Sequence, residues 1–195
     1  MKRFLLILIA GLAVITSGAK TPQKEVQPFE GALRVGPSFP LGTYKGMSNK
    51  VGPNVGLDFR FNYDDMPLDF GVSFDIAGIL RKESSVKVNP AELRYTNWAI
   101  TATSNYNFRQ GHKINPYAGI GLGYIGHAVI DDDLNLNKTG DCSSFLFTPR
   151  IGVELLYHIR IDMSAMICRR GFHCLNLNFG LVIGGRPRKS KIEKE

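Results

Sequence analysis

After residue 28, bulky apolar residues alternate with small or polar ones along one segment after another. A β-strand with one apolar and one polar face produces this period of two. Around residues 145–157, the apolar series is Phe145, Phe147, Ile151, Val153, Leu155 and Tyr157. The polar and small residues between them are Thr148, Arg150, Gly152 and Glu154. Repetition of the pattern predicts eight strands, at 29–39, 53–63, 68–80, 93–109, 116–129, 143–157, 159–168 and 174–184.

The predicted connections alternate in length. Three are long, at 40–52, 81–92 and 130–142, whereas those at 64–67, 110–115 and around His158 are short. The last connection, 169–173, is the exception, because it is short but lies on the long-loop side. Long loops on one rim and tight turns on the other are typical of outer-membrane barrels. We therefore expect an all-β fold, an eight-stranded antiparallel up-and-down transmembrane β-barrel with both termini on the periplasmic side.

Alternation alone does not say which face is inside, since a soluble lipocalin-like barrel buries its apolar face and a membrane barrel turns it toward lipid. The lysines favour the membrane barrel, because every Lys lies outside the predicted strands. A solvated outer face would carry several. The polar face instead combines Arg with Asp and Glu, and the planar Arg fork suits an enclosed charge network. A soluble periplasmic barrel remains the alternative.

The termini predict export. Residues 1–19 have the form of a signal peptide, with basic Lys2 and Arg3, an apolar stretch, and small residues before a cut after Ala19. Residues 20–28 form a polar lead-in, 29–184 the barrel, and 185–195 a basic periplasmic tail. The formal net charge of +7 could indicate nucleic-acid binding, but export argues against that. We expect the protein in the bacterial outer membrane.

The segment Pro116-Tyr117-Ala118-Gly119-Ile120-Gly121-Leu122-Gly123-Tyr124 resembles the Gly-alternating strand of small bacterial outer-membrane, porin-like β-barrels. The hairpin containing Gly152-Val153-Glu154-Leu155 and Arg160-Ile161 is similar to their late hairpin. This resemblance covers about 29–184 and implies an OmpA/OmpX-type fold. The chain departs from it at the end, because such barrels often finish on an aromatic residue and this chain continues into the basic tail. Tyr117 also has the parity of the inner face, unlike the rim aromatics Tyr63, Tyr106, Phe108 and Tyr157.

Ten charged residues on the polar face are the strongest candidate constellation. An eight-stranded barrel is only wide enough for side chains to fill, so we expect a salt-bridged plug in which Arg160 pairs with Glu154 or Asp162. A narrow water or ion path is the alternative. The ten residues are Glu30, Arg34, Asp58, Arg60, Asp69, Asp75, Arg150, Glu154, Arg160 and Asp162.

Cys168 and Cys174 flank the last loop, and both have inward parity. If they oppose each other on an antiparallel hairpin, their Cα atoms lie within disulfide range. The oxidising periplasm permits the bond. A Cys168–Cys174 disulfide is the leading interpretation, with a bridge to Cys142 or three free thiols as alternatives.

No catalytic, cofactor-binding or metal-binding residues are predicted. The four histidines are scattered without ligand spacing, and His158 and Ser164 are too far apart on one strand for a hydrolase dyad. The acidic loop from Asp131 to Asp141 could attract calcium but lacks EF-hand spacing. We expect a non-enzymatic barrel whose partners are the lipid bilayer, lipopolysaccharide and an extracellular protein or host surface reached by the long loops, with no nucleic acid. A small-solute channel is the main alternative, and a lipid-modifying enzyme a third. The sequence does not define the oligomeric state.

Overall fold

The computed structural model describes residues 26–41, 47–49, 51–63, 66–83, 92–130, 136–137, 143–168 and 173–184. These residues form strands and connecting turns, and they contain no helix long and apolar enough to cross a membrane. The strands are β1 (Phe29–Pro40), β2 (Met47–Asn49), β3 (Gly52–Asn62), β4 (Leu68–Glu83), β5 (Glu92–Asn107), β6 (Ile114–Ile130), β7 (Leu136–Asn137), β8 (Ser144–Leu155), β9 (Ile159–Cys168) and β10 (Cys174–Ile183).

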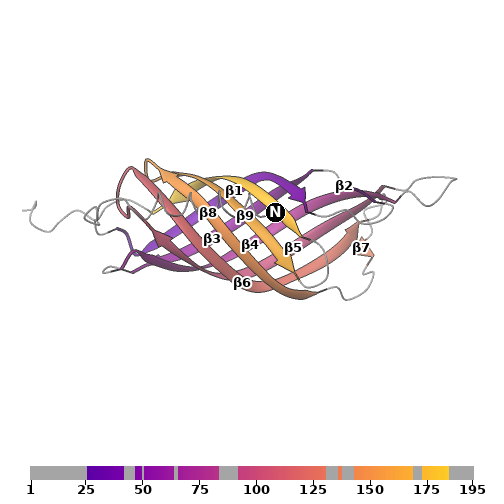
Figure 1. Ribbon diagram of the computed structural model, residues 1–195, viewed down its shortest axis with the longest axis horizontal. Coiled ribbons are helices and arrows are strands. Elements are labelled where there is room, and N and C mark those ends of the chain that lie inside the picture. The colour runs from indigo at the N-terminus through magenta and orange to yellow at the C-terminus, as the bar shows by residue number, and fades with distance from the viewer. Residues whose placement is uncertain are drawn as a thin grey trace, which may run out of the picture.

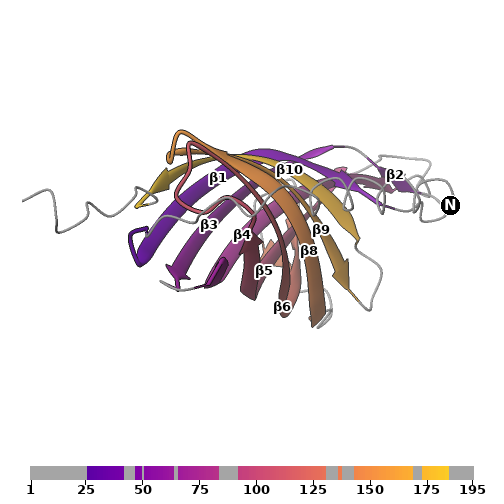
Figure 2. The same cartoon turned by 60° about the vertical axis from the view of Figure 1, so that its left-hand side comes forward.

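Eight of these strands close into an antiparallel barrel (Figures 1 and 2). Around the barrel the order is β1, β3, β4, β5, β6, β8, β9 and β10, and β10 pairs back onto β1. On β1, Leu33 lies opposite Leu57 of β3 on one side and Leu181 of β10 on the other. Each of the eight barrel strands pairs with the barrel strands before and after it in the chain, which is the up-and-down topology that the sequence predicts.

The observed strands confirm the eight predicted ones, with ends that differ by a few residues. The sequence missed two short strands inside segments predicted to be loops. β2 pairs with the end of β4, and β7 pairs with the end of β6. The β4–β5 hairpin also continues to the pair Lys82–Glu92, so part of the predicted loop 81–92 is strand. Strands β4 and β5 project beyond their neighbours at the end opposite the short turns (Figure 1).

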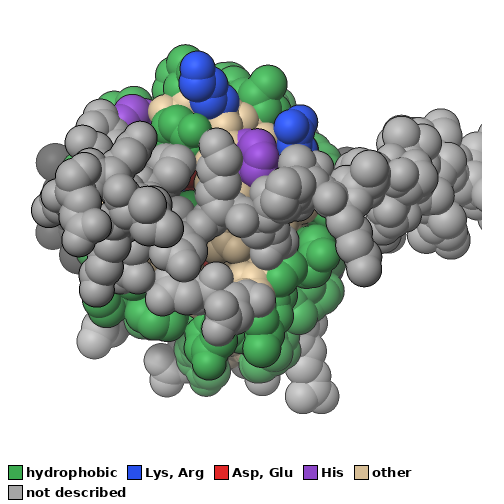
Figure 3. Space-filling model, turned by 90° about the vertical axis from the view of Figure 1, so that its left-hand side faces the viewer, with side chains coloured by type: hydrophobic (Ala, Val, Ile, Leu, Met, Phe, Trp, Pro, Cys, Tyr) green, Lys and Arg blue, Asp and Glu red, His purple; other side chains and the backbone are tan. Residues whose placement is uncertain are grey.

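The exterior of the barrel is apolar. Phe59, Phe70, Ile120 and Phe179 are each at least half exposed, and similar residues occupy alternate positions on every barrel strand. A monomeric soluble protein rarely exposes an apolar patch of more than a few hundred Å², whereas an outer-membrane barrel presents such a band to lipid. Viewed from the end with the short turns, apolar side chains surround the barrel rim (Figure 3). The assignment of the apolar face to the outside is therefore correct.

Candidate functional site: the charged lumen

The ten predicted charged residues all lie inside the barrel, and each is buried. They project from β1, β3, β4, β8 and β9, so their contacts cross the lumen between strands that are distant in the sequence. We refer to these ten residues as the charged network. Each strand contributes them at inward-facing positions, because residues separated by an even number share a face.

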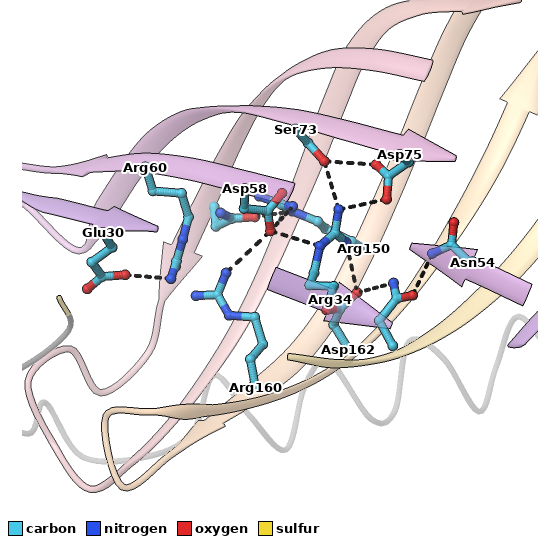
Figure 4. A network of polar contacts seen from close by, with 12 residues as sticks. Glu30, Arg34, Asn54, Asp58, Arg60, Ser73, Asp75, Arg150, Arg160 and Asp162 are labelled. Atoms are coloured by element: carbon cyan, nitrogen blue, oxygen red, sulfur yellow. Dashed lines mark hydrogen bonds and ion pairs between the residues drawn. The ribbon is translucent and has the colours of Figure 1, made fainter. Parts of the chain in front are cut away.

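Arg34 of β1 lies among three carboxylates from three other strands (Figure 4). Its Nε is 3.1 Å from Oδ2 of Asp58, its Nη2 is 2.8 Å from Oδ1 of Asp75, and its Nη1 is 3.5 Å from Oδ1 of Asp162. Nη2 also donates to Oγ of Ser73 at 2.8 Å, and this hydroxyl donates to Oδ2 of Asp75 at 2.9 Å. One guanidinium thereby connects β1 to β3, β4 and β9.

Asp58 of β3 connects Arg34 to the opposite wall. Its Oδ2 is 3.5 Å from Nη1 of Arg150 on β8 and 3.7 Å from Nη1 of Arg160 on β9. Arg160 in turn lies 2.8 Å from Oε2 of Glu154 through its Nη2. The structure therefore gives Arg160 the partners Glu154 and Asp58. The alternative partner predicted from the sequence, Asp162, instead contacts Arg34 and accepts a hydrogen bond from Asn178 at 3.0 Å.

A second cluster lies closer to the short turns and is centred on Arg60 of β3. Its Nη2 is 2.5 Å from Oε2 of Glu30 and 3.4 Å from Oε2 of Glu154, and its Nη1 is 3.4 Å from Oδ2 of Asp69. Asn105 and Asn107 of β5 both donate side-chain hydrogen bonds to Asp69. Because Glu154 contacts both Arg60 and Arg160, the two clusters form one connected network of all ten residues.

The balance of charge and hydrogen bonds determines what this network can do. Four guanidinium groups face six carboxyl groups, all buried, and a buried charge is tolerated only where partners compensate its desolvation. Several buried atoms have no hydrogen-bond partner within the described part of the chain, among them Oδ1 of Asp58, Nη2 of Arg150 and Oδ2 of Asp162. Buried polar groups of this kind ordinarily bind internal water. The network thus connects opposite walls of the barrel, and it leaves polar atoms that internal water can bind.

The inward parity of Tyr117, which the rim aromatics do not share, is explained by its position inside the lumen. It is 2% exposed and lies opposite Gly152 of β8. A Cβ atom at Gly152 would come within 2.7 Å of the Tyr117 ring, so only glycine leaves room for it. The guanidinium carbon of Arg160 lies 4.6 Å from the ring centroid, a cation–π distance. Tyr117 therefore packs against the charged network, a role that the sequence did not predict.

The Gly-alternating segment of β6 provides space in the same way. A Cβ atom at Gly119 would meet Oδ1 of Asn105 at 2.1 Å. That oxygen accepts a hydrogen bond from Nε of Arg150 at 2.6 Å. The inward glycine therefore lets Asn105 of β5 reach over β6 to Arg150 of β8.

A second group of inward side chains is apolar, and the sequence analysis did not identify it. We call it the apolar layer, and it lies toward the end of the barrel away from the short turns. Ile125, Leu146 and Met166 have inward parity, which was the signal that could have revealed them. Its members are Ala99, Ile125, Leu146, Met166, Cys168 and Cys174.

The predicted Cys168–Cys174 pairing rests on a register that is wrong. Cys174 lies opposite Met166, and Cys168 is two residues further along β9. Both cysteines face inward, as parity predicts, but both are free thiols in this structure. Cys142 and the tip of the last loop lie outside the described residues, as do the acidic loop at 131–135, the predicted signal peptide and the tail.

Potential metal ligands do not cluster in the described part of the chain. The described residues contain no group of three or more His, Cys, Asp and Glu that could hold a metal ion. Three described histidines contact the backbone. Nδ1 of His112 lies 3.2 Å from the Gln110 carbonyl, Nδ1 of His158 lies 3.2 Å from the Val182 carbonyl, and Nδ1 of His173 accepts a hydrogen bond from the Cys168 amide at 3.3 Å. The dominant polar arrangement in the described structure is the charged network.

Comparison with solved structures identifies the class of fold. Neisserial surface protein A has a TM-score of 0.54 at 13% identity, covering 81% of this chain and 97% of that protein. The outer membrane protein OprG of Pseudomonas aeruginosa has a TM-score of 0.52 at 12% identity, covering 83% and 99%. No family model and no curated protein matches the sequence. The chain has the fold of the small, eight-stranded outer-membrane β-barrels, as the resemblance in its sequence implies.

Proposed function

We propose that this protein is a non-enzymatic outer-membrane barrel that acts through its outward-facing loops while the charged network blocks its lumen. The observation that carries the proposal is the continuity of the network, in which ion pairs connect β1, β3 and β4 to β8 and β9 across the barrel. Such contacts occupy the width of an eight-stranded barrel with side chains.

Location in the outer membrane is supported by three independent features. The exterior is apolar on every barrel strand, the N-terminal residues have the pattern of an export signal, and the fold is shared with outer-membrane proteins. Lipid and lipopolysaccharide are the surroundings that this location implies.

The role of the loops follows from the asymmetry of the two ends. One end carries short turns, whereas at the other end β4 and β5 extend past their neighbours as far as the pair Lys82–Glu92 (Figure 1). In a barrel with a blocked lumen, the connecting segments on the rim are where binding residues are most often found. A protein or surface outside the cell is the partner class we propose.

Cysteine labelling in intact cells tests this orientation. In a background in which the native cysteines are replaced by serine, a single Cys is placed at Asn49, Ser85 or Asn137, and a matched control carries it at Asp65. We expect a membrane-impermeant thiol reagent to label the first three positions and not the fourth. Labelling at Asp65 with protection of the other three would show the opposite orientation.

A small-solute or water path is the second candidate function. The unpaired buried atoms of Asp58, Arg150 and Asp162 favour it, because they provide polar sites for water inside the barrel. Ion conductance across a planar bilayer separates the two candidate functions, because only the solute or water path would conduct.

A further inference from the structure

A groove lies between two of the short turns, outside the lumen and apart from the charged network. It has a volume of about 340 Å³. Its lining combines three basic side chains with an aromatic and an aliphatic one: Arg109, His112, Lys113, Ile114 and Tyr157. Figure 3 shows Lys or Arg and His side chains close together at this end of the barrel, beside the apolar exterior.

The backbone joins the two turns and positions Tyr157. The amide of Leu156 in the β8–β9 turn donates to the carbonyl of Lys113 in the β5–β6 turn at 2.6 Å. Leu156 and Tyr157 have φ angles of 54° and 67°, in the left-handed region that bulky residues rarely adopt. Backbone strain of this kind often accompanies a ligand site. Here it holds a tyrosine at the edge of the groove.

The groove begins where the apolar exterior ends. Ile114 is 53% exposed, is the first residue of β6 and lies opposite Leu155, which lies opposite Ile159. On the neighbouring strand, the rings of Tyr106 and Phe108 meet edge to face at 5.1 Å. Aromatic side chains with a polar end prefer the boundary between acyl chains and headgroups. The groove is therefore at headgroup depth.

The exposed charge that the described side chains give the groove is positive. Among the side chains that the structure describes, Arg109 and Lys113 are the exposed Lys and Arg residues, because the four other arginines belong to the charged network. Every described Asp and Glu side chain is buried in the lumen. The arginine fork and the lysine ammonium are both good partners for phosphate oxygens.

We propose that this groove binds one anionic glycerophospholipid from the leaflet at the short-turn end of the barrel. The phosphate lies between Arg109 and Lys113, and an acyl chain follows the exposed aliphatic row that starts at Ile114. This inference rests on the membrane location proposed above. It adds to that location a specific lipid site, with the charge of the headgroup as the selected feature.

Titration with a soluble short-chain lipid tests the site. Full-length protein is folded in maltoside micelles, and amide chemical shifts are followed by NMR as dihexanoylphosphatidylglycerol is added. We expect saturable shifts in the segment Arg109–Ile114 and at Tyr157. In the double variant Arg109→Gln/Lys113→Gln, the apparent Kd should weaken on the order of tenfold, given the usual contribution of a basic residue near an anionic lipid surface. The single variant Arg109→Gln should weaken it severalfold and serves if the double variant does not fold.

A matched variant removes the same charge elsewhere. Lys189→Gln/Lys191→Gln in the basic tail should leave the Kd within about twofold of the wild type. Equal weakening by this tail variant would overturn the site in favour of general charge attraction. Equal binding of dihexanoylphosphatidylcholine would overturn headgroup selection, and equal binding of glycerol 3-phosphate would overturn lipid as the ligand.

The membrane location is tested separately by insertion of the full chain into phospholipid vesicles. Failure of the wild type to insert would overturn both the location and the lipid site. Normal insertion together with an unchanged Kd in the double variant would overturn the lipid site alone.

Discussion

The charged network and the apolar layer occupy the same barrel interior and follow the same period of two, yet they connect strands in different ways. The charged network joins β1, β3 and β4 to β8 and β9 through ion pairs that cross the lumen. The apolar layer joins β5, β6, β8, β9 and β10 by packing. Together the two regions contact every strand of the barrel. The comparison teaches that inward parity determines whether a side chain is buried. Whether that side chain is charged or apolar determines how much stability is lost when it is removed.

The loss of stability should be largest in the charged network, because removal of one charged side chain leaves its partners buried without an opposite charge. Replacement of Arg160 by Leu would leave Glu154 without its 2.8 Å partner and Asp58 without one of three guanidinium contacts. We expect the free energy of unfolding to fall by about 3–5 kcal/mol, the range for a broken buried ion pair. Denaturant unfolding of the protein in lipid vesicles measures this change.

Two variants provide the controls for Arg160→Leu. Arg160→Lys keeps the charge but loses the planar fork, and it should have an intermediate effect. Lys189→Gln removes a charge outside the charged network and should change stability by no more than about 0.5 kcal/mol. An unfolding midpoint for Arg160→Leu equal to that of the wild type would show that the ion pairs do not brace the barrel.

A methyl group at Gly152 should disturb the charged network through Tyr117. A Cβ atom there would lie 2.7 Å from both the Tyr117 ring and the carbonyl oxygen of Ile161. We expect Gly152→Ala to cost about 1–3 kcal/mol, the range for overpacking a filled interior. Gly31→Ala is the matched control, because a Cβ atom at Gly31 has nothing within 4 Å. Equal stability of the two variants would contradict the close packing of Tyr117.

The apolar layer should respond least to a small truncation. Ile125 is 0% exposed, and Ile125→Val removes one methylene group without introducing a charge. We expect a loss of about 0.5–1.5 kcal/mol in the same unfolding assay. A loss as large as that of Arg160→Leu would remove the distinction between the two regions.

The sequence predicted the strands and their faces because both follow from the alternation of side chains along one strand. For example, Asp58 and Phe59 are adjacent in the sequence and lie on opposite sides of the wall. Alternation predicts this orientation without knowledge of any other strand. The same reasoning placed the two cysteines inside the barrel.

Contacts across the lumen could not be predicted in this way. They depend on the tilt and stagger of the strands, which set the height of each side chain along the barrel axis. Arg160 therefore contacts Asp58 on β3, although Asp162 is two residues away on its own strand. The offset of Cys168 from Cys174 has the same origin, because the hairpin register places Met166 opposite Cys174. The short strands β2 and β7 were missed because two or three residues carry no detectable period.

The most direct test of the account is the ion conductance of the purified wild-type protein in a planar lipid bilayer. Because the charged network crosses the lumen from β3 to β8, we expect no sustained conductance steps, and we expect Arg34→Ala, which removes the central guanidinium, to produce them. Insertion is verified independently by protease protection of the barrel. Regular conductance steps from the inserted wild-type protein would contradict a blocked lumen and would identify the barrel as a channel.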